Sequence, residues 1–122
     1  MKAAGKAERW VCDAGGDTVA VLDIPAALDR PRVFDIDASL LVRVPENAPG
    51  AWHELVVEID GRRQWTRRIP SHNPGQTDSL DYHWRLTLET GRALRVRALA
   101  TVRGSQVHRL CLEAQEEPAR HG

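Results

Sequence analysis

Apolar and polar side chains alternate along residues 80–102. The apolar set comprises Tyr82, Trp84, Leu86 and Leu88 before a turn and Leu94, Val96, Ala98 and Ala100 after it. A period of two buries one set and leaves the other in water, because successive side chains of a strand point to opposite faces. The turn, Thr90-Gly91-Arg92, contains the glycine that positive φ angles favour. This stretch therefore predicts a β-hairpin with one solvent-exposed face.

Similar alternation recurs elsewhere in short runs separated by turn residues, at 9–13, 18–24, 32–44, 53–60, 62–69 and 106–114. No stretch keeps an apolar period of 3.6, and the nearest helix candidate, 25–30, is stopped by Pro31. Run 62–69 carries arginines on both sides, which is typical of an edge strand that avoids pairing with another chain. We therefore expect an all-β chain that forms a single antiparallel β-sandwich of about eight strands, immunoglobulin-like or jelly-roll.

The chain has 122 residues, a single-domain length. We expect a flexible leader at 1–7, the β-sandwich domain at 8–115 and a flexible tail at 116–122. The first residues lack the apolar core of a signal peptide and no run is long enough to span a bilayer, so we expect a cytoplasmic protein. Cys12 and Cys111 are then expected as thiols, although they would lie close if the first and last strands were neighbours.

The charge balance limits the classes of partner. The 17 basic and 17 acidic side chains cancel, whereas nucleic-acid and membrane-surface binding need a surplus of basic charge on one face. We therefore expect no nucleic acid and no membrane among the partners. No sequence feature calls for a cofactor.

A candidate ligand site follows from counting strand reversals after Val44. If each connection reverses the chain, loops 45–52 and 70–81 and the turn at 103–105 gather at one end of the sandwich. The side chains brought together there would be Trp52, His53, His72, Asn73, Gln76, Asp78, Asp81 and Arg103. An aromatic platform with amides and carboxylates suits a sugar, so carbohydrate is the first expected ligand. In pattern and length alone, the layout with its ETGRALRVRAL segment is similar to accessory β-sandwiches that include carbohydrate-binding modules.

Two other interpretations of the same loops remain open. In the first, Trp52 closes the end of the core, and Asn73, Asp78 and Asp81 support the loop through bonds to its backbone. In the second, His72, Asp78 and Asp81 form an inward-facing small-molecule or metal site, although their spacing matches no zinc or calcium motif. The sequence also lacks a nucleophile elbow and a phosphate-binding glycine loop, so we predict a binding protein and not an enzyme.

Trp65 supports a different class of function. It lies among arginines in the expected edge strand 62–69, where it is either ordinary core or an exposed aromatic of the kind enriched at interfaces. An exposed Trp65 would predict a protein-interaction or assembly domain, with a homodimer as one form.

Overall fold

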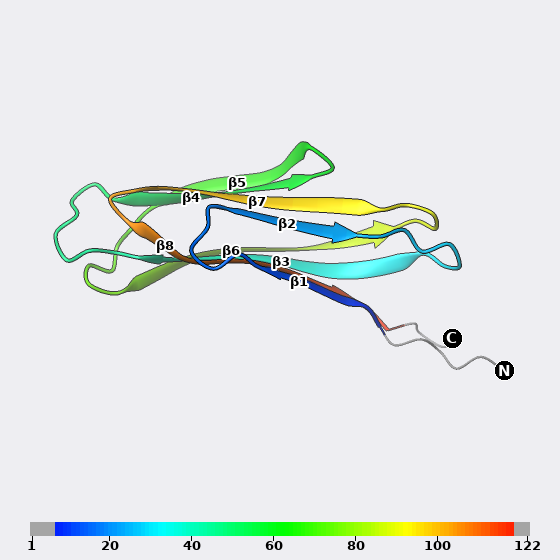
Figure 1. Cartoon of the computed structure of the whole chain (residues 1–122). Helices are drawn as coiled ribbons and strands as arrows, with labels where there is room; N and C mark the ends of the chain where they lie inside the picture. The colour runs from blue at the N-terminus through cyan, green and yellow to red at the C-terminus, as the bar shows by residue number, and fades with distance from the viewer. Residues whose placement is uncertain (1–6, 119–122) are drawn as a thin grey trace.

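Eight strands in two antiparallel sheets make up the part of the chain that the computed structural model describes, residues 7–118. Sheet A has the order β1 (Arg9–Asp13), β8 (Gln106–Glu116), β3 (Arg32–Arg43), β6 (Thr77–Leu88). Sheet B has the order β2 (Val19–Ile24), β7 (Leu94–Arg103), β4 (Trp52–Ile59), β5 (Arg62–Pro70). The sheets form two layers (Figure 1), which confirms the β-sandwich. None of the described residues forms a helix long and apolar enough to cross a membrane.

The strands pair as a nested set. β4 pairs with β5, β3 with β6, β2 with β7 and β1 with β8, all antiparallel. Pairing of β3 with β8 and of β4 with β7 then joins the nested pairs into sheets. A nested double ribbon rolled into two sheets is the jelly roll, one of the two sandwich types that the sequence left open.

The hairpin expected at 80–102 is wrong, although its two strands exist. β6 pairs with β3 in sheet A, whereas β7 pairs with β2 and β4 in sheet B. The connection 89–93 therefore crosses from one sheet to the other. Alternation predicts the buried face of a strand but not its neighbour, and in this nested order only β4 and β5 are consecutive strands of one sheet.

The core lies between the sheets and is built from the alternating apolar sets. Phe34, Ile36, Ala38, Leu40 and Val42 of β3 are fully buried, and β7 contributes Leu94, Val96, Ala98 and Ala100 as expected. Strict alternation fails in β8, where the pairing with β3 shifts between Leu41 and Val42. The shift turns Val107 toward the core and leaves His108 exposed.

An ionic cluster ties the two ends of the described chain together. Arg32, with a side chain only 1% exposed, donates to Glu8 Oε1 at 2.7 Å and to the Pro25 carbonyl at 2.7 Å. Arg30 Nη2 donates to both Glu8 and Glu116 at 3.0 Å. Burial raises the pKa of Glu8, but hydrogen bonds from Trp10 and Arg32 and the charges of Arg32 and Arg30 outweigh it and lower the pKa overall.

Residue 116 therefore belongs to the domain and not to the expected tail. Glu116 ends β8 and is 7% exposed. The backbone N–H of the next residue, Glu117, donates to the Val33 carbonyl at 2.8 Å. Residues 1–6 of the expected leader and 119–122 of the expected tail lie outside the described residues.

Candidate functional site

Loops 45–51 and 71–76 and the turn at 104–105 meet at one end of the sandwich, which we call the loop end. Backbone hydrogen bonds join the start of the first loop to the end of the second. Val44 N–H donates to the Gln76 carbonyl, and Gly75 N–H donates to the Val44 carbonyl, both at 2.8 Å. Ser71 N–H donates to the Ala51 carbonyl at 2.8 Å. The strand reversals inferred from the sequence thus bring these loops together as expected. The second loop is shorter than the expected 70–81, because residues 77–81 already belong to β6.

His53, one of the expected ligand-binding residues, lies in the core with no exposed surface. Its Nδ1 atom is 2.8 Å from Ser71 Oγ, and Ser71 Oγ donates onward to Ser105 Oγ at 3.4 Å. Within residues 7–118, its Nε2 atom is buried and has no hydrogen-bond partner. Burial lowers the pKa of His53, although the Asp78 carboxylate and the backbone of Ser79 act in the opposite direction. His53 is therefore a neutral core residue that links β4 to the loops, and a ligand has no access to it.

Polar side chains in loop 71–76 and at the start of β6 support the loop itself. Asp78 accepts from the backbone N–H groups of His72 at 3.1 Å and Ser79 at 2.9 Å. Asn73 Nδ2 donates to the Thr77 carbonyl at 3.2 Å. These contacts match the loop-supporting interpretation, since side-chain bonds to backbone groups replace the sheet pairing that the loop lacks. Gln76 contributes its carbonyl to Val44, and its side chain is exposed.

Trp52 lies on the outer face of sheet B and is half-buried. The Arg68 guanidinium sits 3.8 Å from the centre of its ring, which is close cation–π packing. Arg103, opposite Trp52 in the pairing of β4 with β7, is exposed. Trp52 thus does not close the core, and Arg68 already covers one face of its ring.

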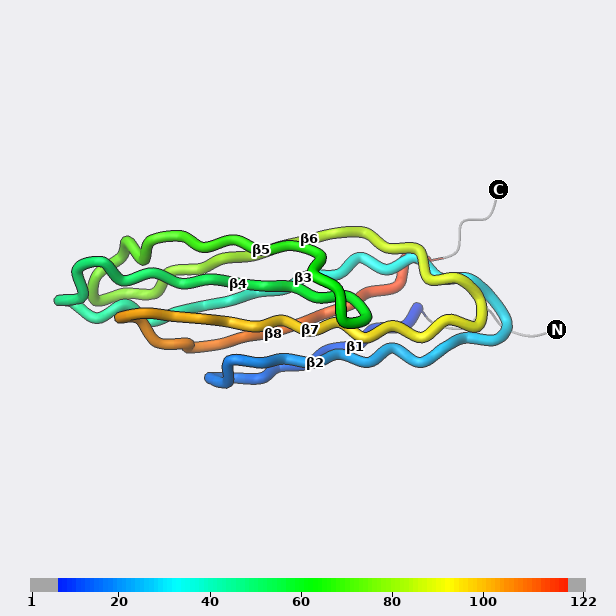
Figure 2. The backbone as a smooth tube through the Cα atoms, turned by 90° about the horizontal axis from the view of Figure 1, so that it is seen from above, coloured from blue at the N-terminus to red at the C-terminus, as the bar shows by residue number. Residues whose placement is uncertain are grey.

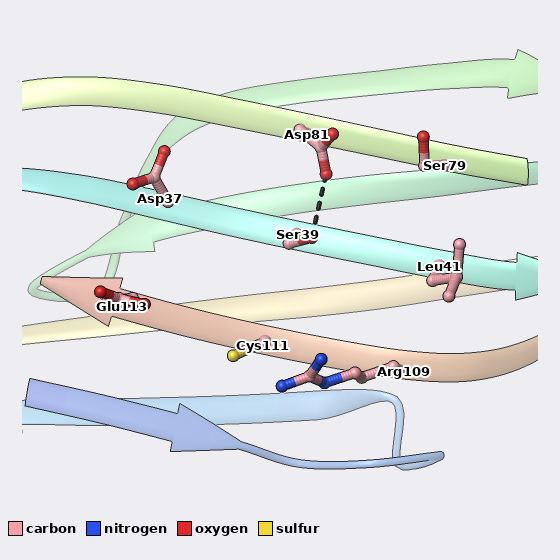
Figure 3. Close-up of a pocket in the computed structure, with 8 residues that line it drawn as sticks. All are labelled: Asp37, Ser39, Leu41, Ser79, Asp81, Arg109, Cys111 and Glu113. Carbon is pink, nitrogen blue, oxygen red and sulfur yellow. Dashed lines mark hydrogen bonds between the residues drawn. The ribbon is translucent and has the colours of Figure 1, made fainter.

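Asp81 does not join the loop end, so its expected place there is wrong. It lies along β6 on the outer face of sheet A, opposite Ser39, whose hydroxyl donates to its carboxylate at 3.0 Å (Figure 3). A shallow cavity of about 340 Å³ opens there, lined by Asp37, Ser39, Leu41, Ser79, Asp81, Arg109, Cys111 and Glu113. Among the described residues, no group of three or more His, Cys, Asp and Glu side chains is placed to hold a metal ion. The inward-facing His72, Asp78 and Asp81 cluster is therefore not formed.

Two of the charged residues that line this cavity, Arg109 and Glu113, are paired with residues of β1. Arg109 pairs with Asp13 at 2.9 Å and Arg9 pairs with Glu113 at 3.0 Å. Burial raises the pKa of the Cys111 thiol, so it is less ionised than an ordinary cysteine. The cavity therefore carries two groups that are already ion-paired and a thiol that ionises less readily than usual.

The two cysteines are on neighbouring strands and are both free. Cys12 is opposite Leu112, which is buried, whereas Cys111 is opposite Asp13, which is exposed. Opposite residues of an antiparallel pair share a face, so the two thiols point to different sides of sheet A. The two cysteines are therefore free thiols, as expected, and their positions do not suit a disulfide.

Trp65 is half-buried and turns toward the interior. Its ring stacks on Tyr82 with centroids 4.4 Å apart, and Tyr82 stacks on Trp84 at 5.0 Å. The stack connects edge strand β5 of sheet B with edge strand β6 of sheet A. Trp65 therefore supports the sandwich edge, with one face of its ring covered by Tyr82.

β5 is the edge strand that the sequence predicted, and it carries four arginines. Arg68 pairs with Glu54 at 3.4 Å. The other three, Arg62, Arg63 and Arg67, have no acidic partner within residues 7–118 and are exposed. Arg67 lies opposite the inward Leu55 and Arg63 opposite the outward Glu58, so positive charge stands on both sides of the strand. Figure 2 shows β5 along one long side of the molecule. We call Arg62, Arg63 and Arg67, with the strand that carries them, the β5 edge.

The sequence carries a signal for the ionic cluster of Arg32 and Glu116, but none for the unpaired state of three of the β5 arginines within the described residues. Arg32 and Glu116 are in phase with the buried sets of β3 and β8, which marks them as inward charges that need partners. The arginines of β5 were interpreted only as protection against pairing. Whether these arginines find ion-pair partners depends on which strands flank β5, and that order is not visible in the sequence.

Comparisons with known proteins add information on the fold alone. No family model and no curated protein matches the chain. Among solved structures, dimeric latent PorU from Porphyromonas gingivalis is similar, with a TM-score of 0.57 and 10% sequence identity. The likeness is one of fold. The match covers 90% of this chain but only 12% of the PorU chain, so this chain corresponds to a small part of that protein.

Proposed function

We propose that this domain is a non-catalytic protein-interaction module that binds an acidic, extended segment of a partner along the β5 edge. The observation that carries the proposal is the set of three exposed arginines without acidic partners, Arg62, Arg63 and Arg67, on a strand with one unpaired side. An unpaired strand edge offers backbone donors and acceptors to an added strand, and side-chain charge selects which strand is accepted.

The positive charge of the β5 edge repels basic strands and attracts acidic ones. It repels a second β5 edge, which is the protective role that arginines have on edge strands. It attracts glutamate and aspartate, because opposite charges on directly paired residues of neighbouring strands stabilise the pair. Since arginines stand on both sides of β5, an acidic segment gains from carboxylates on either of its own faces.

The aromatic stack of Trp65 and Tyr82 holds β5 against the interior of the sandwich. Trp65 is held between the sheets by Tyr82, so β5 has a rigid backing at its middle. A rigid edge loses little conformational freedom when a strand is added, which favours binding. Trp65 also provides an optical probe, since it lies between Gln64 and Thr66 on the strand where the partner would be added.

The test is fluorescence anisotropy with a labelled peptide of alternating glutamate and valine, and a lysine–valine peptide for comparison. We expect the acidic peptide alone to bind, more weakly as salt is added. The double variant Arg63→Glu, Arg67→Glu should raise its dissociation constant at least about tenfold. The matched control, Arg43→Glu with Arg92→Glu, makes the same charge change on β3 of the other sheet and in connection 89–93, and should leave binding nearly unchanged. Equal losses in both variants, or no binding by the wild type at low salt, would contradict the proposal.

Carbohydrate binding at the loop end is a second candidate, favoured by the half-exposed Trp52 and the exposed Arg103 opposite it. The ring face that Arg68 leaves open is the surface available for a sugar. A panel of polysaccharides titrated against wild type and Trp52→Phe, followed by tryptophan fluorescence, tests it. A saturable change lost in Trp52→Phe and retained in Trp10→Phe would support it. A flat titration would remove it.

A further inference from the structure

The four edge strands of the sandwich are protected unequally. β5 carries four arginines, β1 carries Arg9 and Asp13, and β6 carries Asp81 and Arg85 among its exposed residues. β2, with the sequence Val-Ala-Val-Leu-Asp-Ile, contains no proline, lysine or arginine. Its one charged residue, Asp23, is paired with Arg95, which donates to it at 2.8 Å and 3.2 Å. The charges of β1 are paired as well, but β1 carries two in five residues and β2 only one in six. Edge strands without charge or proline are open to pairing with another chain.

β2 also displays apolar surface. Val19 and Val21 are 42% and 39% exposed, whereas Ala20, Leu22 and Ile24 face the core. On the outer face of sheet B, Val19 stands opposite Leu99 of β7, and Leu99 opposite Val56 of β4. The apolar row therefore runs from the β2 edge into the sheet. Figure 2 shows β2 on the long side of the molecule opposite β5 and β6.

We propose that two copies of this chain associate through β2, which pairs antiparallel with its own copy. Antiparallel self-pairing follows from a two-fold axis perpendicular to the sheet, so the contact closes on itself as a dimer. The two sheets B then form one continuous sheet of twice the width. Because opposite residues share a face, the allowed registers pair outward residues with outward residues, and a register centred on Val21 brings the two Val21 side chains together.

The charge distribution favours a second copy as the occupant. The formal net charge of the chain is zero, so two copies meet without long-range repulsion. Asp23 is already paired with Arg95 and adds no repulsion to the contact. The dimer would leave both β5 edges at its outer ends. Pairing through β2 is thus independent of the partner proposed for β5, and either can fail without the other.

The test is the mass of the full chain in solution, measured by sedimentation equilibrium from low micromolar to millimolar concentration. We expect a monomer–dimer equilibrium for the wild type. Val21→Lys places two like charges across the pair and should raise the dissociation constant at least about tenfold. Val11→Lys is the matched control, because Val11 is 44% exposed on the other edge strand, β1, on this side of the fold. It should dimerise as the wild type does.

Thermal unfolding of both variants separates a folding defect from a loss of association. Both should melt cooperatively, since each changes an exposed side chain. A wild type that stays monomeric throughout would overturn the proposal. So would a dimer that persists in Val21→Lys, or one that is weakened equally by Val11→Lys, because the contact would then lie on another surface. Binding of an unrelated edge peptide without self-association would identify a different occupant and would also overturn it.

Discussion

Arg32 and Glu8 form an ion pair of 2.7 Å although the Arg32 side chain is only 1% exposed. Arg32 is the first residue of β3, whereas Glu8 comes directly before β1. Through Arg30 the contact extends to Glu116, the last residue of β8. The cluster thus joins the starts of β1 and β3 to the end of β8 in sheet A, at the end opposite the loop end.

Arg32→Ala should destabilise the fold by about 3 kcal/mol, because it leaves Glu8 partly buried without its closest cation. The double variant Arg32→Met, Glu8→Gln should recover most of this loss, since it removes both charges and keeps the volume. Urea unfolding followed by circular dichroism measures both. A loss below about 1 kcal/mol for Arg32→Ala would show that the pair contributes as little as a surface ion pair.

Stability should fall as the pH drops below about 6.5, the ordinary pKa of histidine. The pKa of His53 is lowered in the folded state, so the unfolded chain binds the proton more readily. The stabilisation is complete above the unfolded pKa and is lost as pH falls toward the folded one. His53→Gln should remove this slope below about pH 6.5 in urea titrations. An unchanged slope would assign it to another group.

Acid should act again at lower pH through Glu8. Because its folded pKa is depressed, its contribution is present above the ordinary glutamate pKa and is lost as pH falls below it. Glu8→Gln should flatten the stability profile below about pH 4.3 and leave the histidine region intact. Titrating His53→Gln and Glu8→Gln in parallel distinguishes the two groups, because each variant should lose the pH dependence of stability in only one of the two pH ranges.

Mild oxidants should not join Cys12 to Cys111 within one chain. The thiols point to opposite faces of sheet A, so a bond would require the strands to twist apart. The raised pKa of Cys111 should also slow its alkylation at neutral pH. Mass spectrometry after diamide treatment of the native protein reads both outcomes. An intrachain disulfide formed without unfolding would contradict the assigned faces.

Tyr82→Leu should destabilise the sandwich by roughly 1–2 kcal/mol and change the near-ultraviolet circular dichroism of the tryptophans. The tyrosine ring stands between Trp65 and Trp84, so its loss breaks both stacks. The oligomeric state should not change, since the stack joins β5 and β6, which Figure 2 shows on the side opposite β2. A change in mass with unchanged stability would instead assign the aromatic edge to an interface.

Much of the fold was predictable because burial in a strand has a period of two. The inward sets of β3 and β7 follow from alternation, and the turn Asp60-Gly61 marks the β4–β5 hairpin, where Asp60 adopts a φ of 49°. Bulges limit this reasoning, because one extra residue at His108 reverses the faces on either side of it. The candidate site was predicted less well. The loops converge as expected, but His53 is buried and Asp81 lies on another face.

By itself, the sequence determined that the chain folds as a β-sandwich, which residues are buried in its long strands, and which loops lie together. These properties are local or follow from counting strand reversals. Only the tertiary structure decided which strands are neighbours, and with them the sheet crossing at 89–93, the enclosure of Arg32 and the unequal protection of the edges. The physical reason is that backbone hydrogen bonding between strands is nearly independent of side-chain identity, so neighbours are chosen by packing of the whole chain.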